Sequence, residues 1–243
     1  MKISFGAGLT RRSRRVLART ESGEGACACT LLGQLSTKMK ERMSWIDIVT
    51  KEQAEGRLRA LYESVAGPGG KVDNVLQVHS LRPHTLEAHM ALYKSVLHHS
   101  GNKLPKWLLE TIGVYVSLLN GCTYCVEHHF AGLGRLLNDD DRLRQIRHAL
   151  ETGNFAEAFE RREQTILNYA RQLTRSPAEM RESAIEKMRA AGLDDGEILE
   201  VNQVVSYFAY VNRTVLGLGV TTRGDTLGLS PNDSDDPENW HHK

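Results

Sequence analysis

Apolar residues recur every three or four positions along most of residues 44–222, and the alternation typical of strands is nearly absent. This period places apolar side chains on one face of an α-helix. We expect one helix to begin at Thr50, capped with the help of Gln53, and another to follow Pro83. The pattern predicts an all-α domain whose later helices span 105–119, 122–137, 139–151, 155–174, 178–191 and 195–217.

The two ends of the chain differ from this helical region. The first 20 residues contain six basic and no acidic residues, and residues 1–43 lack helical periodicity. We expect a disordered extension or a start codon assigned too early, in preference to a targeting or nucleic-acid-binding arm. Residues 223–243 combine prolines with acidic residues and have little to bury, so we expect a disordered acidic tail. The expected organisation is one helical domain over 44–222 between two unstructured ends.

Charge and composition exclude several classes of function. Basic and acidic residues number 31 and 30, so the net charge of +1 does not draw the chain onto nucleic acid or a membrane surface. The longest stretch without a charged residue, 111–126, is shorter than the about 20 apolar residues that cross a bilayer. We expect a cytoplasmic protein that binds neither membranes nor nucleic acid.

A short internal echo raises the hypothesis of two related helical halves. Glu110 recurs ninety positions later as Glu200. Glu200 precedes Asn212 by the same interval that separates Glu110 from Cys122. The echo predicts a duplicated helical unit whose second copy lacks cysteines.

Four cysteines lie in two close pairs, Cys27 with Cys29 and Cys122 with Cys125. The small number of pairs and the lack of a secretory leader argue against a secreted disulfide framework. In a reducing compartment, a C-x-x-C pair is usually a redox pair or half of a metal site, and less often two core thiols. The residues around the second pair therefore decide its interpretation.

A helix junction at Gly121 brings further reactive groups toward the second pair. Cys122 and Cys125 fall in the first turn of a helix, where unpaired N–H groups favour a thiolate, and their spacing allows a disulfide. His129 lies one turn beyond Cys125 on the same face and can take its proton. If the two helices form an antiparallel hairpin, Glu110 lies opposite His129. This geometry predicts a relay from Glu110 through His129 and Cys125 to Cys122.

Each of these residues taken alone has a simpler interpretation. Taken alone, Glu110 is more simply explained as a solvated residue on the surface of its helix. Taken alone, His128 or His129 is more simply explained as a surface or capping histidine. A C-x-x-C pair alone divides evenly between functional and structural roles. Their joint occurrence favours the functional interpretation.

Four residues form the pattern E-x(11)-C-x-x-C-x(3)-H: Glu110, Cys122, Cys125 and His129. This pattern resembles the motif of the carboxymuconolactone decarboxylase and AhpD-like alkylhydroperoxidase superfamily, in its peroxidase-related branch. Two further sequence segments are typical of that branch, the VSLLNGCTYC around the cysteines and the later Asn212-Arg213. The resemblance covers about residues 44–221, and it implies an all-α AhpD-like fold that assembles as a homo-trimer or hexamer.

The resemblance also implies a chemistry, the reduction of hydroperoxides by a dithiol. By that resemblance, Cys125 attacks the peroxide, Cys122 resolves the resulting sulfenic acid, and Glu110 with His129 relays the proton. An external dithiol would reduce the enzyme, and we expect no metal or organic cofactor. One position departs from the pattern, since the better-studied peroxidases carry a histidine directly before the second cysteine, where this chain has Tyr124.

Three other functions stay open at this point. The same fold hosts lactone decarboxylation, which needs acid–base residues and no thiol pair. A dithiol redox sensor without enzymatic activity would use the disulfide to switch an interface. Metal binding through Cys122, Cys125 and His129 is less favoured, because zinc sites of this type usually draw a further pair of ligands from elsewhere.

The last expected helix bears on assembly, because its apolar residues cover more than one face over 197–218. Such a helix packs against two neighbours. Both burial within one chain and burial at an interface between copies fit the pattern.

Overall fold

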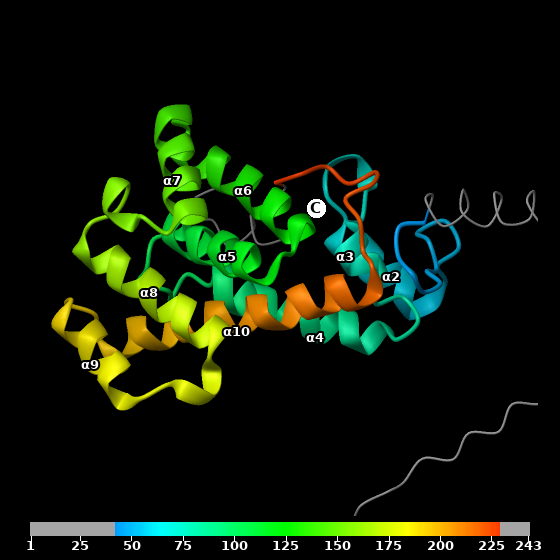
Figure 1. Ribbon diagram of the computed structural model, residues 1–243. Coiled ribbons are helices and arrows are strands. Elements are labelled where there is room, and N and C mark those ends of the chain that lie inside the picture. The colour runs from blue at the N-terminus through cyan, green and yellow to red at the C-terminus, as the bar shows by residue number, and fades with distance from the viewer. Residues whose placement is uncertain (1–41, 229–243) are drawn as a thin grey trace, which may run out of the picture. The chain divides into compact units, whose positions relative to one another are not determined.

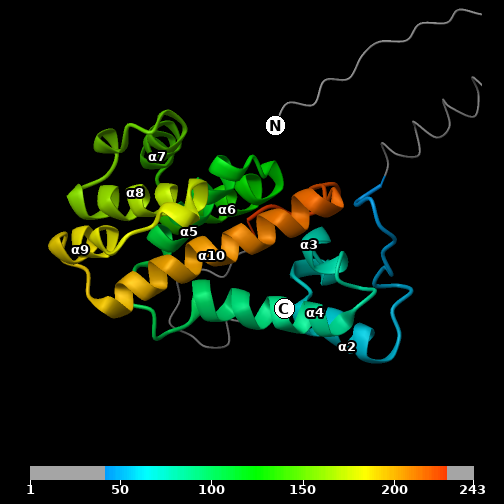
Figure 2. The ribbon, with the colours of Figure 1, turned by 60° about the horizontal axis from the view of Figure 1, so that its bottom comes forward.

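A computed structural model describes residues 42–228, and every regular element in that range is helical (Figures 1 and 2). The all-α prediction is therefore confirmed. The α-helices are α2 (Gly56–Val65), α3 (Asn74–Gln77), α4 (Pro83–Tyr93), α5 (Lys106–Asn120), α6 (Thr123–Leu137), α7 (Asp140–Thr152), α8 (Arg161–Arg175), α9 (Glu182–Ala190) and α10 (Asp195–Leu218). Residues 1–41 and 229–243, which include Cys27 and Cys29, lie outside the described residues.

Three of the expected helix starts are wrong. The helix expected from residue 178 starts at Glu182, after a separate 3₁₀ turn over Pro177–Glu179. Thr50 begins a turn, in which its N–H donates to Oε1 of Gln53 at 3.2 Å, and the helix starts only at Gly56. The helix expected from residue 155 starts at Arg161, because residues 155–157 form a separate 3₁₀ turn. Phe155 is buried in that turn, so the apolar spacing continues although the helix does not.

Helix α5 lies at the centre of the domain and packs against α6, α8 and α10 (Figure 1). All its residues from Leu108 to Ser117 are buried. Pro105 is its N-cap, and Gly121 ends it with a left-handed φ of 70°. At this turn the N–H of Cys122 donates to the carbonyl of Ser117 at 2.9 Å, so the chain reverses directly into α6. The predicted α5–α6 hairpin is confirmed.

Helix α10 buries its apolar faces within this one chain. A capping box between Asp194 and Glu197 starts it, and Gly219 ends it with a φ of 62°. Most of its large apolar residues are buried, among them Val201, Val204 and Phe208, whereas Leu199, Tyr210 and Leu216 are exposed. Burial within the chain accounts for most of the apolar pattern, and oligomerisation stays a prediction.

The chain after α10 corrects the expected domain boundary at residue 222. Asp225 is buried at its side chain and accepts hydrogen bonds from Tyr124 Oη and the Asn74 backbone N–H. Arg135 donates to the carbonyl of Leu227 at 2.8 Å. In Figure 1 this segment runs back from the end of α10 between α3 and α6. Hydrogen bonds, which apolar patterning does not reveal, hold residues 223–228 on the domain.

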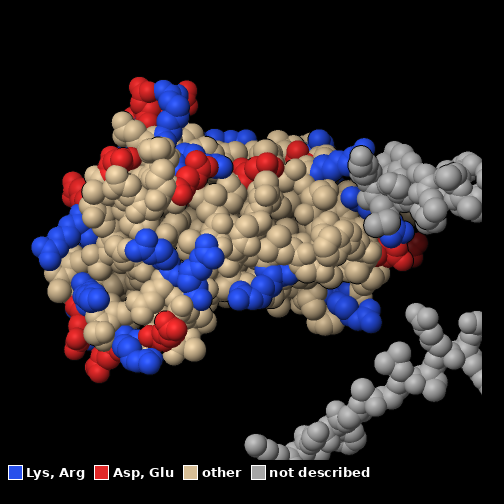
Figure 3. Space-filling model, in the orientation of Figure 1, with Lys and Arg blue, Asp and Glu red and all other residues tan. Residues whose placement is uncertain are grey.

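The described surface agrees with the balanced charge of the sequence. Basic and acidic side chains are scattered among uncharged ones on the face drawn in Figure 3. Within residues 42–228, no helix is both long and apolar enough to cross a membrane.

Candidate active site

The α5–α6 hairpin brings Glu110 and His129 into contact. Nδ1 of His129 lies 2.7 Å from Oε2 of Glu110, and the two side chains are 12% and 3% exposed. A buried carboxylate is costly without a partner, and the imidazole provides one. The predicted pairing is therefore present, and a solvated position for Glu110 is excluded.

The two thiols lie side by side at the start of α6. Cys122 is the N-cap and Cys125 lies in the first turn, with their Sγ atoms 2.9 Å apart. Both are free thiols, and they are 0% and 2% exposed. Their spacing on one helical face therefore brings the two sulfurs within reach of a disulfide after a small movement.

The two thiols differ in how readily they lose a proton. The hydrogen bond with Cys125 lowers the pKa of Cys122, with smaller contributions from His129 and Asn212 and against the effect of burial. The hydrogen bond with Cys122, burial and the Cys122 charge raise the pKa of Cys125 well above its usual value. Of the two thiols, Cys122 therefore loses its proton more readily and Cys125 less readily.

Asn212 of α10 closes the site from the side opposite the hairpin. Its Nδ2 donates to Ser117 Oγ at 3.0 Å, and its Oδ1 accepts from Asn120 Nδ2 at 2.9 Å. Its side chain also hydrogen-bonds to both thiols, which lowers the pKa of each. The sequence signal for Asn212 was its place in a sequence segment typical of the peroxidase-related branch, and its role at the sulfurs was missed.

Glu200, the partner of Asn212 in the internal echo, lies elsewhere. It accepts the backbone N–H groups of residues 103 and 104, so the duplication stays a hypothesis.

Phe208 of α10 packs against the His129 ring. The two rings meet edge to face with centroids 4.6 Å apart. The Phe208 ring reaches this position over Gly113 of α5, where an added Cβ would lie 2.2 Å from it. Only glycine permits this approach, so the small residue supports the geometry of the Glu110–His129 pair.

Gly113→Ala is expected to destabilise the fold by about 2 kcal/mol, because the new methyl group displaces the Phe208 ring from a filled core. Gly217→Ala is the matched control, since Gly217 also lies inside a helix but meets no atom within 4 Å. That control should be neutral or stabilising by up to about 1 kcal/mol. Urea unfolding of both variants measures the difference, and equal stability would contradict the packing described here.

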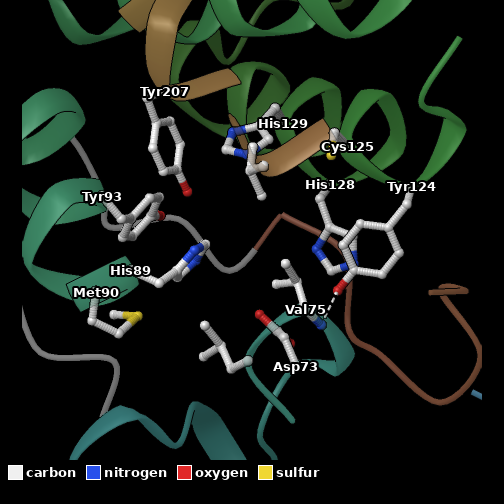
Figure 4. Close-up of a pocket in the computed structure, with 12 residues that line it drawn as sticks. Asp73, Val75, His89, Met90, Tyr93, Tyr124, Cys125, His128, His129 and Tyr207 are labelled. Atoms are coloured by element: carbon white, nitrogen blue, oxygen red, sulfur yellow. Dashed lines mark hydrogen bonds between the residues drawn. The ribbon is translucent and has the colours of Figure 1, made fainter. Parts of the chain in front are cut away.

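A cavity of about 60 Å³ opens beside Cys125 (Figure 4). This volume holds about four water molecules, or a small organic group. Cys125, His128 and His129 line one side, and the residues on the others are Asp73, Val75, Leu76, His89, Met90, Tyr93, Tyr124, Tyr207 and Val211. Cys122 does not line the cavity, and neither Lys nor Arg occurs among its described lining residues.

Comparison with solved structures identifies the fold. An uncharacterised peroxidase-related protein from Ralstonia eutropha JMP134, described as an alkylhydroperoxidase AhpD core, matches with a TM-score of 0.64 and 21% identity, over 76% of this chain and 95% of that one. A peroxidase-related protein from Silicibacter sp. TM1040 matches with a TM-score of 0.63 and 23% identity, over 76% and 94%. The chain has the AhpD-like fold.

The AhpD-like fold is not restricted to peroxidase-related proteins. The debrominase Bmp8 matches this chain with a TM-score of 0.60 and 16% identity, over 76% of this chain and 94% of that one. A cysteine variant of Bmp8 was solved in complex with 2,3,4-tribromopyrrole. No protein-family model and no curated protein matches this chain. The activity of this AhpD-like domain has to be argued from its own site.

Tyr124, the departure from the AhpD motif, belongs to a second polar cluster beside the thiols. Its Oη donates to Asp225 Oδ2 at 2.6 Å and accepts the Val75 N–H at 3.1 Å. Its ring stacks on His128 with centroids 4.5 Å apart, and His128 Nε2 lies 3.3 Å from Asp225 Oδ2. Burial and the Asp225 charge raise the pKa of Tyr124 well above its usual value, so it stays a hydrogen-bond donor.

Several cavity residues of this AhpD-like domain were missed by the sequence prediction. Asp73 and His89 come from segments remote from the C-x-x-C pair, and Asp225 lies in the expected tail. His128 was noted only as a neighbour of His129. Within residues 42–228, no group of three or more His, Cys, Asp or Glu side chains is arranged to hold a metal ion.

Proposed function

We propose that this protein is a thiol-dependent peroxidase that reduces organic hydroperoxides or hydrogen peroxide through Cys125 and Cys122. The supporting observation is the adjacent pair of thiols, with the buried Glu110–His129 pair beside them and Cys125 lining a small cavity. A nucleophile, a base and a residue that orients the base are the parts that activate a thiol.

The attacking sulfur is Cys125, because it faces the cavity and Cys122 does not. Cys122, the thiol whose pKa is lowered, first gives its proton to His129, and the Cys125 proton then passes to the Cys122 sulfur 2.9 Å away. The Cys125 thiolate then attacks the terminal oxygen of the peroxide. The O–O bond breaks, Cys125 becomes a sulfenic acid, and an alcohol or water leaves.

Cys122 completes the reaction. Its sulfur attacks the Cys125 sulfenic acid, a disulfide forms, and water leaves. Glu110 orients His129 and stabilises its cation, so that His129 holds the proton removed from the thiols. An external dithiol returns two electrons to the disulfide in each cycle, and no metal or organic cofactor takes part. We propose that the protein acts in the cytoplasm as a homo-trimer or hexamer.

The charged groups that line the cavity favour uncharged substrates. Its described lining includes the Asp73 carboxyl and contains no Lys or Arg. A carboxymuconolactone carries carboxylates, which need cationic partners when they leave water. To a carboxylate, the described lining offers histidines but no permanently charged cation, which favours a hydroperoxide over the lactone substrate, the first alternative.

Turnover tests this proposal. Reduced protein is mixed with tert-butyl hydroperoxide and an excess of dithiothreitol, and peroxide consumption is followed. We expect many turnovers per chain, and none in a variant that lacks both Cys122 and Cys125. A single oxidation per chain without turnover would support a redox sensor instead. Bromide release from 2,3,4-tribromopyrrole in the absence of peroxide turnover would support dehalogenation.

A further inference from the structure

Asp73 occupies a capping position but does not cap its helix. It is the N-cap of α3, where an aspartate side chain usually accepts a hydrogen bond from the helix start, yet it makes no such bond. The carboxylate of Asp225, far along the chain, accepts the Asn74 N–H instead, at 3.1 and 3.3 Å. The cap is thus supplied by another residue, and the Asp73 carboxyl is released from this structural role.

The released carboxyl faces the cavity. Asp73 lines it together with Cys125, His128 and His129. In Figure 4 its oxygens point into the cavity from the wall opposite Cys125 and His129. A substrate that places one oxygen on the Cys125 sulfur would therefore place its other end toward Asp73.

The surroundings of Asp73 let it keep its proton to a higher pH than an ordinary aspartate does. Burial raises the pKa of Asp73 to about 6, the charge of Asp225 adds to this effect, and His128 and His129 oppose it. The neighbouring Asp225 carboxyl has other partners, since it accepts hydrogen bonds from Tyr124 and Asn74. Asp73 therefore carries a proton below about pH 6, whereas an ordinary aspartate ionises at about pH 4.

We propose that Asp73 is a catalytic acid of this site, which donates its proton to the oxygen that leaves when Cys125 cleaves the peroxide. This inference rests on the proposed function. The sulfur loses two electrons to the O–O bond, the terminal oxygen stays on sulfur as the sulfenic acid, and the leaving alkoxide takes the Asp73 proton to become an alcohol. Asp73 regains a proton from water before the next cycle.

The experiment varies the leaving group. An alkoxide is a poor leaving group that needs a proton, whereas the carboxylate that leaves from a peracid does not. At about pH 5, where Asp73 keeps its proton, Asp73→Asn is expected to slow the oxidation of Cys125 by tert-butyl hydroperoxide by about 10²-fold, and to leave the reaction with peracetic acid nearly unchanged. Asp140→Asn, a change at an exposed aspartate of α7, is the matched control and should alter neither rate.

A merely structural role would slow both reactions equally, and that result would overturn the proposal, as would no change in either rate. Thermal unfolding of Asp73→Asn should occur at no lower temperature than in the native sequence at neutral pH, because folding raises the pKa of this buried carboxyl. If the native protein oxidises with neither peroxide, the proposed function fails and this inference with it. If it oxidises with both and the variant keeps their ratio, only this inference fails.

A second measurement needs no variant. In the native protein, the ratio of the two rate constants removes the effect of thiol ionisation. The ratio of the tert-butyl hydroperoxide rate to the peracetic acid rate should fall as the pH rises through about 6, because Asp73 loses its proton there. A ratio that stays constant from about pH 5 to about pH 7 would contradict the role of Asp73.

Discussion

Cys125→Ser is expected to abolish peroxide reduction, whereas Cys122→Ser should keep one oxidation per chain. Cys125 is the sulfur that lines the cavity, so its loss removes the nucleophile. Without Cys122 the sulfenic acid forms but has no resolving thiol, and it accumulates. The Cys122→Ser reaction should also be slower, since a serine hydroxyl accepts the Cys125 proton less readily than the Cys122 sulfur 2.9 Å away.

A sulfenic-acid-specific probe and intact mass measure this difference. Both variants are prepared with Cys27→Ser and Cys29→Ser, so that no other thiol contributes. A variant with only these two changes is the control and should retain full turnover. Sulfenic acid in Cys125→Ser and none in Cys122→Ser would reverse the assignment, with Cys122, the thiol whose pKa is lowered, as the attacking sulfur.

Glu110→Gln is expected to lower the rate of Cys125 oxidation by about 10²-fold with little loss of stability. Glutamine keeps the shape of Glu110 and an oxygen for His129 Nδ1, which now lies 2.7 Å from the carboxylate. It removes the negative charge that stabilises the His129 cation, so His129 holds the thiol proton less well. Stopped-flow oxidation and urea unfolding separate the two effects.

The matched control for this change is Glu200→Gln. Glu200 is the counterpart of Glu110 in the internal echo, but it accepts backbone N–H groups before α5 and lies outside the cavity lining. Its substitution should reduce stability slightly and leave the oxidation rate unchanged. Equal rate losses in the two variants would show that the effect of Glu110 is structural.

The sequence predicts the part of the site that depends on local spacing. The break at Gly121 and the helical period on both sides of it are enough to place Glu110 opposite His129 and to align the two cysteines. These contacts lie within two consecutive helices. Their geometry follows from residues per turn and from the position of one reversal.

The remaining part of the site depends on contacts between distant segments. Asp225 reaches Tyr124 and Asn74 across more than a hundred residues, and these are hydrogen bonds of polar groups in chain without regular structure. Hydrophobic periodicity contains no information on such contacts. The approach of Phe208 to Gly113 is similar, because it depends on how α10 crosses α5.

The central claim is that Cys122 and Cys125 form a reactive dithiol, and disulfide mapping after a single turnover tests it most directly. Fully reduced protein is treated with one equivalent of tert-butyl hydroperoxide, its free thiols are counted, and its disulfides are mapped by peptide mass spectrometry. The account predicts the loss of two thiols per chain and a Cys122–Cys125 bond. Unreacted thiols, or a bond between other cysteines, would contradict it.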